Sequence, residues 1–363
     1  MNLSLLLLML LLLLLCVLPG SSGHNHHHHH DDHHHNHDHA LEDEEAVAEK
    51  DDRRLDKMTK QQAQQQEQHY GSQGQYKSFR QWTQSSDFKT TGARCGSHAS
   101  VDGTAKAKQT YAKWMKQHDC DDETGNCPYM QHLRMGHSFR TIQVYWHSIQ
   151  KTQGTEGASE TVIWDAMDVL NSAFVGTGFQ FDLMDITVTN YTPYWEASRQ
   201  SQDEFDMKAE LHRGSCEHLN IYSTGADGLL GWAWFPWDCE SSDWYDGVVL
   251  NYNTLPGGSA FPYNLGDTLT HEVGHWLGLF HTFEGGCSAN GDFISDTPAE
   301  AFPDYDCEQN RDSCGDGGRA DDVTNFMNYG PDSCMDHFTI GQVGRMHAAV
   351  SAYRPKPPRP WPY

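Results

Sequence analysis

The spacing of apolar residues predicts a mixed α/β chain with its regular elements in the middle of the sequence. Residues 141–149 alternate apolar and polar side chains as a strand does. Residues 159–175 repeat apolar side chains at helical spacing, which predicts an amphipathic helix that faces a core. Shorter patterns predict strands at 179–184, 219–222 and 248–252 and helices at 111–118 and 203–212. This order indicates an α/β layer, and the Gly-, Asp- and Asn-rich sequence after Cys287 indicates loops.

The start of the chain is typical of a targeting signal. Residues 3–18 are almost unbroken leucine, and small residues follow up to Gly23. This run of 16 residues is shorter than the roughly 20 residues of a membrane-spanning helix. We therefore expect residues 1–23 to be a signal peptide and the protein to be secreted and extracellular; an uncleaved anchor is the alternative.

The next segment is too polar to form a core. Residues 24–39 hold 11 of the 24 histidines, and a charged, Gln-rich stretch follows. We expect residues 24–75 to be disordered. The histidines have two interpretations: a solvated tail that binds stray zinc or copper, or a dedicated metal-loading or pH-sensing segment.

The charge balance excludes two classes of partner. Asp and Glu number 50 against 25 Lys and Arg, a formal net charge of -25. Nucleic acids and anionic membranes both bind basic surfaces. We therefore expect no nucleic-acid partner and no stable membrane association, and we expect a monomer.

The cysteines indicate an oxidising compartment and one unpaired thiol. The chain has ten cysteines, and Cys16 lies in the leader, which leaves nine. Because nine is odd, one thiol has no partner within the chain. Cys95 stands apart, upstream of the region that we expect to fold.

The sequence from Asp267 to His281, DTLTHEVGHWLGLFH, carries the candidate chemistry. We expect a helix over residues 268–277 with Asp267 as its N-cap. His271 and His275 are four residues apart, so both rings project from one helix face and can bind one metal ion.

The rest of this motif completes a catalytic site. Gly278 can adopt a positive φ, which ends the helix and returns His281 to the same ion as a third ligand. Three imidazoles leave one position open for water, as in catalytic zinc sites. Glu272 lies beside His271, where its carboxylate can reach that water as a general base. The pattern HExxHxxGxxH arises by chance at roughly one start site in 10⁶.

These residues and a later segment resemble the metzincin clan of zinc proteases. Asn325-Phe326-Met327-Asn328-Tyr329 is similar to the Met-turn of that clan. Within the clan the chain resembles the pappalysin family, in particular the small secreted, fungal-type extracellular metalloproteases. The similar segments are LNIYSTGADGLLGWAWFP, DGVVLNYNTLPGG, the zinc helix, SDTPAE and NFMNYGPDSCMDHFTIGQVGRM.

The resemblance implies a fold and roles for further residues. The fold would be α/β (α+β), with a twisted sheet and the active-site helix in an upper subdomain and a loop-rich, disulfide-held lower subdomain. Met327 would form a hydrophobic floor beneath the metal. Tyr329 would stabilise the oxyanion, and a core tyrosine is the alternative. Residues 229–235 would form the edge strand that pairs with an extended substrate.

The resemblance also implies a calcium loop and a set of disulfides. Asp292, Asp296 and Glu300 would help to hold Ca²⁺, although such residues are equally common in plain turns. Two crossed bridges would follow the zinc helix, and two pairs would remain. The four bridges are Cys287–Cys314, Cys307–Cys334, Cys216–Cys239 and Cys120–Cys127.

Pro-segments of related enzymes contain Arg-Cys-Gly, the sequence of residues 94–96 here. The Cys95 thiolate would bind the zinc and displace the catalytic water; a free thiol or an intermolecular disulfide is the alternative. We expect a pro-segment at 76–136, a catalytic domain at 137–354 and a Pro-rich tail at 355–363.

Together these features predict a secreted zinc metalloendopeptidase that is made as a latent zymogen and acts on proteins or peptides. The alternatives are a secreted His-rich metal-binding protein and a catalytically inactive, peptide-binding relative.

Overall fold

A computed structural model of the chain describes residues 78–91, 94–121, 127–129, 140–154, 156–288, 291–315 and 319–355. The expected signal peptide and His-rich segment, and all of the expected Pro-rich tail except its first residue, lie outside these residues. Among the described residues, no helix combines the length and the apolar character needed to cross a membrane.

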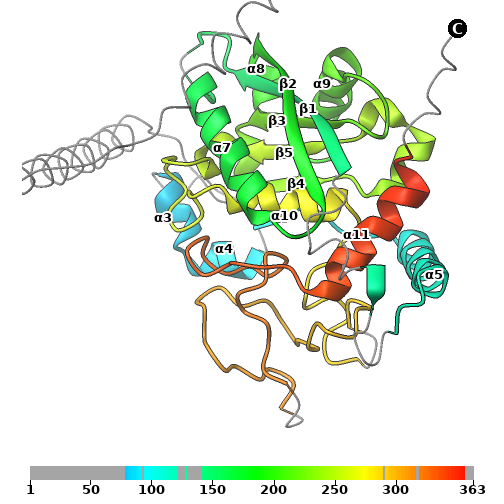
Figure 1. The fold of residues 1–363 in the computed structure, drawn as a ribbon. Coiled ribbons are helices and arrows are strands. Elements are labelled where there is room, and N and C mark those ends of the chain that lie inside the picture. The colour runs from blue at the N-terminus through cyan, green and yellow to red at the C-terminus, as the bar shows by residue number, and fades with distance from the viewer. Residues whose placement is uncertain are drawn as a thin grey trace, which may run out of the picture. The chain divides into compact units, whose positions relative to one another are not determined.

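A twisted five-stranded sheet forms the centre of the fold (Figure 1). Its strand order is β2-β1-β3-β5-β4, and all neighbours are parallel except β4 and β5. The strands are β1 (Arg140–Gln150), β2 (Phe179–Asn190), β3 (Leu219–Thr224), β4 (Gly231–Ala233) and β5 (Val248–Asn251). The short strand β4 is therefore an edge strand, and it lies within the range 229–235 expected for one.

Helices cover both faces of the sheet. On one face, Val144 and Ile221 pack in a core with side chains from α7 (Glu160–Ala173), α10 (Asp267–Trp276) and α11 (Ile340–Tyr353). On the other face, Tyr222 and Val249 pack with α8 (Thr192–Trp195) and α9 (Gln202–Leu211). Successive strand residues enter opposite cores because side chains alternate along a strand. The predicted α/β fold is confirmed.

The start of α10 differs from the sequence-based expectation. The helix begins at Asp267, and its N-cap is Gly266 with a φ of 107°, so the prediction of Asp267 as N-cap was wrong. A distant side chain provides the capping acceptor instead. The Asp332 Oδ2 atom accepts the backbone N–H groups of Leu265, Gly266 and Asp267 at 2.8–3.4 Å.

Two helical regions extend beyond what the sequence indicated. Helix α5 (Val101–Gln117) begins ten residues before the expected 111–118, with Ser100 as its N-cap. Helix α11 follows a capping box formed by Thr339 and Gln342, in a region expected to be loops. Two short helices, α3 (Phe79–Thr83) and α4 (Ser86–Thr91), precede α5. Four 3-10 helices are also described: η1 (Ala226–Gly228), η2 (Pro236–Ser241), η3 (Asp243–Tyr245) and η4 (Tyr252–Thr254).

Disulfides hold the loops that follow α10. The structure joins Cys120–Cys127, Cys216–Cys239, Cys287–Cys314 and Cys307–Cys334. These are the four pairs that the resemblance implied. Among the described cysteines, Cys95 alone is free, and it is buried.

Candidate metal centre

Three histidine rings converge at the end of α10. His271 and His275 project from one face of the helix, and their Nε2 atoms are 3.2 Å apart. Gly278, with a φ of 101°, turns the chain after the helix. His281 then returns to the same point, where its Nε2 atom lies 3.1 Å from that of His275. All three rings are buried.

Backbone carbonyls fix the tautomers of the two helical rings. The Nδ1 atom of His271 donates to the Phe326 carbonyl at 2.7 Å, and that of His275 donates to the Leu279 carbonyl at 2.8 Å. Burial lowers the pKa of His275 to about 3 and that of His271 well below its usual value, so both rings are neutral. Each Nε2 atom therefore carries a lone pair that can bind a metal ion. Metal-binding histidines are commonly held in this way, with the other ring N–H donated to a carbonyl.

This donor set fits a zinc ion. Ligands at a Zn–N distance of about 2.0–2.1 Å stand about 3.3 Å apart at the corners of a tetrahedron, close to the two Nε2 separations. The Cys95 sulfur is a fourth candidate ligand, and the four ligand atoms all lie within 4.8 Å of one another. Burial and the neighbouring Glu272 raise the pKa of the Cys95 thiol, so a thiolate there needs a cation beside it. Throughout the described residues, no other group of three or more His, Cys, Asp or Glu side chains converges in this way.

Glu272 points from α10 into the same space. Its Oε2 atom accepts the Ser97 hydroxyl at 3.0 Å and lies 3.5 Å from the Cys95 sulfur. Its Oε1 atom is buried and has no hydrogen-bond partner. Burial raises the pKa of Glu272 to about 7. The absence of a side chain at Gly231 leaves room for it, because a Cβ there would lie 3.0 Å from the Glu272 Cγ.

Met327 and Tyr329 both lie beside the histidine cluster. A Cβ added to Gly274, in the middle of α10, would overlap the Met327 sulfur, so Met327 packs directly against the helix that carries the histidines. The Tyr329 ring is buried, 5.0 Å from the His281 ring and 5.8 Å from the His271 ring, measured between centroids.

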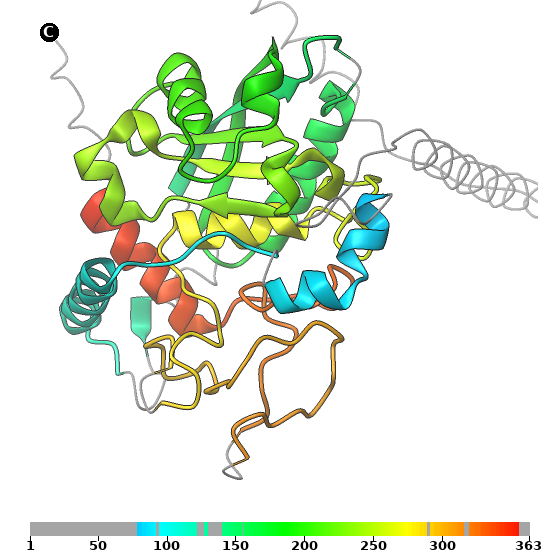
Figure 2. The same cartoon turned by 180° about the vertical axis from the view of Figure 1, so that it is seen from behind.

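The segment that contains Cys95 runs along the edge strand β4. The Gly96 N–H donates to the Gly231 carbonyl at 2.9 Å, and the Ser97 hydroxyl accepts the Ala233 N–H at 2.8 Å. Figure 2 shows this segment crossing alongside β4 and α10 on its way to α5. The segment therefore joins β4 through one backbone and one side-chain hydrogen bond, and Cys95 and Ser97 are buried in the groove along this strand.

Arg94 anchors this segment at one end. Its fully buried guanidinium donates to the Thr268 hydroxyl at 2.6 Å and lies 3.8 Å from the Asp332 carboxylate. It also lies over the Tyr263 ring, 4.8 Å from the centroid. Sequence reasoning missed Asp332 and Ser97. No local pattern marks these two residues, because their contacts join positions far apart in the chain.

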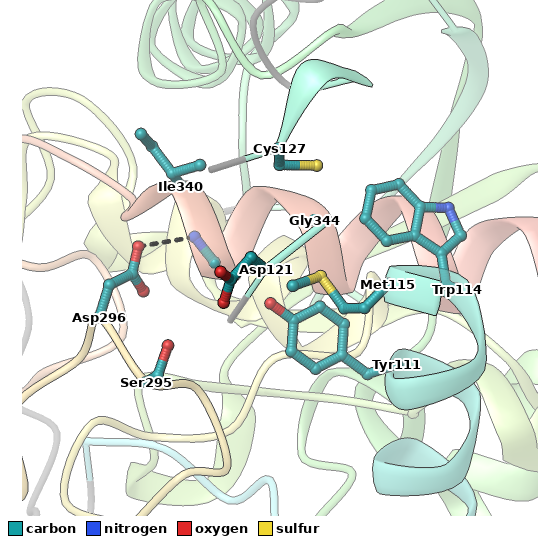
Figure 3. A pocket seen from close by; sticks show the side chains of 10 residues that line it. Tyr111, Trp114, Met115, Asp121, Cys127, Ser295, Asp296, Ile340 and Gly344 are labelled. Atoms are coloured by element: carbon teal, nitrogen blue, oxygen red, sulfur yellow. Dashed lines mark hydrogen bonds between the residues drawn. The ribbon is translucent and has the colours of Figure 1, made fainter. Parts of the chain in front are cut away.

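The other end of the segment enters α5, which packs on α11. A Cβ at Gly344 of α11 would lie 3.3 Å from the Trp114 ring and 3.5 Å from the Tyr111 ring of α5. Figure 3 shows the small cavity that remains between the two helices, where the Asp296 carboxylate accepts the Gly341 N–H at 2.8 Å.

The three expected calcium ligands do not converge among the described residues. Asp296 accepts the Thr339 hydroxyl at the start of α11. Glu300 is bound by Arg311, Thr282 and Asn328. The Asp292 Oδ1 atom accepts the Thr297 hydroxyl and the Ile294 N–H. Asp296 and Glu300 thus accept protein donors at both oxygens, whereas the Asp292 Oδ2 atom is buried without a hydrogen-bond partner.

The sheet, the histidine helix, the Met-turn and the convergent rings together define a metzincin-type metallopeptidase. Comparisons with known proteins agree. The peptidase M43 family, described as pregnancy-associated plasma protein-A, matches residues 209–351. An extracellular metalloprotease of Colletotrichum graminicola is 43% identical over 222 residues, which are 59% of this chain and 78% of that one. One of Neurospora crassa is 41% identical over 221 residues, 59% of this chain and 75% of that one.

A solved structure is similar over a longer stretch. A mutant of promirolysin from Tannerella forsythia is 26% identical, with 72% of this chain and 95% of that one covered and a TM-score of 0.51. The chain belongs to the pappalysin family of metalloproteases.

Proposed function

We propose that the protein is a secreted zinc endopeptidase that is made as a latent precursor. His271, His275 and His281 would hold the zinc, and Glu272 would be the general base. The observation that carries the proposal is the convergence of three neutral imidazoles on one point beside a buried carboxylate oxygen without a partner. The names of the relatives, extracellular metalloproteases, support the location.

Each residue of the site would have its own role in amide hydrolysis. When bound, zinc would lower the pKa of a coordinated water to about 7 and polarise the scissile carbonyl. Glu272 accepts a proton from the attacking water on a carboxylate oxygen and delivers it to the leaving amine nitrogen. Tyr329 donates its hydroxyl to the oxyanion. Burial raises the Tyr329 pKa, which keeps the hydroxyl protonated for that purpose.

The substrate would bind as an added strand on β4. The carbonyl of Gly231 and the N–H of Ala233 already bind Gly96 and Ser97. A substrate backbone would use the same two groups after these residues leave. Such pairing depends on backbone atoms, so it fits an endopeptidase that accepts many sequences.

Latency would come from the pro-segment, expected at residues 76–136, of which Gly96 and Ser97 lie along β4. Cys95 would fill the fourth ligand position, and its contact with Glu272 would keep the base away from water. Arg94 and α5 would hold the segment on either side. Catalysis would then require removal of the pro-segment from the groove. The proposal includes one zinc ion, and calcium stays a prediction: Asp296 and Glu300 are bound by protein donors, whereas the Asp292 Oδ2 atom is buried without a hydrogen-bond partner.

One assay tests the proposal. Processed wild-type enzyme, Glu272→Ala and chelator-treated wild type are incubated with casein and a peptide library. We expect cleavage by the wild type alone. Cleavage by all three samples, or by none, contradicts the proposal. Peptide binding without turnover in the wild type would identify an inactive relative. A function lost only on deletion of residues 24–39 would identify a metal-binding protein.

A further inference from the structure

A fully buried ion pair lies on the face of the sheet opposite α10. The Lys208 Nζ atom is 2.8 Å from the Glu204 Oε1 atom, and both side chains are completely inaccessible to solvent. Burying two charges is costly, so the geometry around such a pair must be good for it to persist. The hydrolysis chemistry proposed above uses neither residue.

Glu204 binds three separate segments of the chain. Its Oε1 atom accepts the indole N–H of Trp232 at 2.7 Å. Its Oε2 atom accepts the Tyr245 hydroxyl at 2.7 Å and the backbone N–H of Gln200 at 2.6 Å. Two of these three segments form walls of the groove that Gly96 and Ser97 occupy.

The first wall is β4. Trp232 is the middle residue of this three-residue strand, between the two residues whose backbone groups bind the pro-segment. Within the sheet β4 has one neighbour, β5, with three paired positions. Backbone pairing on one side therefore fixes its position only in part, and the bond from the Trp232 indole to Glu204 supplies a second attachment.

The second wall is the turn before α9. Gln200 has a φ of 62°, an uncommon conformation for a residue with a side chain, and its N–H is held by Glu204. The preceding residue, Arg199, reaches the groove: its Cδ atom would lie 3.0 Å from a Cβ on Gly96. The same carboxylate thus orients β4 and the Arg199 turn.

Lys208 keeps this carboxylate charged. Burial alone would raise the pKa of Glu204, but the charge of Lys208 and the hydrogen bonds outweigh it, so the pKa lies below its usual value. Lys208 is itself held by the Tyr245 carbonyl at 3.1 Å and by the rings of Tyr222, Trp234 and Tyr245. An ionised carboxylate makes stronger hydrogen bonds than a neutral one.

We propose that Glu204 is a positioning residue for the substrate, which holds β4 through Trp232 and the Arg199 turn through Gln200 so that an extended peptide can pair with the sheet edge. This inference rests on the proposed function, since it concerns the groove of that same site. Its consequence is that disturbing the Glu204–Trp232 bond weakens the binding of peptides long enough to pair with β4.

The test uses mature enzyme in five forms: wild type, Glu204→Gln, Trp232→Phe, the double variant and Glu210→Gln. Glu210 is a matched control, because it lies on the same helix and accepts the Tyr194 hydroxyl at 2.7 Å, in contacts separate from the groove. Each form is assayed for kcat and KM on two peptides with the same scissile bond. One peptide is about eight residues long, which at about 3.3 Å per residue is long enough to pair with the whole of β4. The other peptide is too short to pair with this strand.

We expect Glu204→Gln and Trp232→Phe each to lower kcat/KM on the long peptide about tenfold, mainly through KM, and to change the short peptide less than about twofold. The double variant should lose no more than Glu204→Gln alone, because Trp232→Phe removes a bond that Glu204→Gln already disturbs. Glu210→Gln should match the wild type.

A purely structural role would instead reduce the yield or the melting temperature and leave both peptides equally affected. Equal losses on the two peptides, or additive losses in the double variant, contradict the inference. If Glu204→Gln does not fold, Trp232→Phe alone tests the inference, because it leaves the Glu204–Lys208 ion pair intact. A wild type that cleaves neither peptide contradicts the proposed function, whereas a cleaving wild type with an unchanged Trp232→Phe contradicts this inference alone.

Discussion

The sulfur of Cys95 lies 3.5 Å from the Oε2 atom of Glu272, the proposed general base, and within 4.8 Å of the ligand atoms of the three histidines. Ser97 completes the contact, because its N–H donates to the Cys95 sulfur at 3.2 Å and its hydroxyl to Glu272 at 3.0 Å. A three-residue segment therefore contacts the histidine cluster, the proposed general base and the edge strand β4 together. The proposed latency would therefore rest on these contacts.

Arg94 should control how firmly this segment is held. Arg94→Ala removes a buried hydrogen bond to Thr268 and leaves the Asp332 carboxylate buried without its cation, a change that costs about 3 kcal/mol or more. We expect the purified precursor to show at least tenfold more peptidase activity. Lys89→Ala is the control, because the Lys89–Asp306 pair is at the surface and contributes little. Equal activity in the two variants would argue against an anchoring role.

Gly278 should be required for the third histidine to reach the site. Gly278→Ala places a side chain at a φ of 101° and brings its Cβ to 2.8 Å from that of Ala349. We expect a loss of stability above about 1 kcal/mol and weaker zinc retention against a chelator. Gly257→Ala is matched, since its φ is also positive, at 78°, but no atom lies within 4 Å of the new Cβ. Similar zinc retention in both variants would contradict the role of the turn.

The stability of the loop region should fall in mildly alkaline solution. The carboxylates of Asp322 and Asp336 raise the pKa of His337 from 6.5 to about 9. Because the pKa of His337 is higher in the folded than in the unfolded chain, protonated His337 stabilises the fold, and this stabilisation is complete below pH 6.5. That stabilisation is lost as the pH rises through about 9. The melting temperature should therefore decline between pH 6.5 and about pH 9, and the decline should be smaller in His337→Gln. An identical decline in the variant would exclude His337 as its source.

The sequence was sufficient for the parts of the molecule that local pattern controls. The spacing of His271, His275 and His281 placed three ligands on one point, and the apolar periodicity of residues 159–175 identified α7. The N-terminal half of α5 was missed because residues 101–110 carry few apolar side chains. Its buried residues, Gly103 and Ala107, pack beside Trp237, which lies far along the chain. The cap of α10 was wrong for a related reason, since its acceptor, Asp332, lies 65 residues away.

In the wider site, too, features set by local sequence could be predicted and contacts between distant residues could not. Cys95 could be identified from the odd number of cysteines after the leader and from the Arg-Cys-Gly sequence around it. The Glu204–Trp232 bond could not, because it joins a helix to an edge strand 28 residues later. Among the described residues, the three carboxylates expected to bind calcium each have protein partners, which a Gly- and Asp-rich composition does not reveal.

X-ray absorption at the zinc edge, made on the purified precursor and on Cys95→Ser, tests the central claim most directly. The account predicts one zinc per chain in both proteins. It also predicts a Zn–S distance of about 2.3 Å in the precursor, with only nitrogen and oxygen ligands in the variant. A precursor that binds no zinc, or whose zinc has no sulfur ligand, would contradict it.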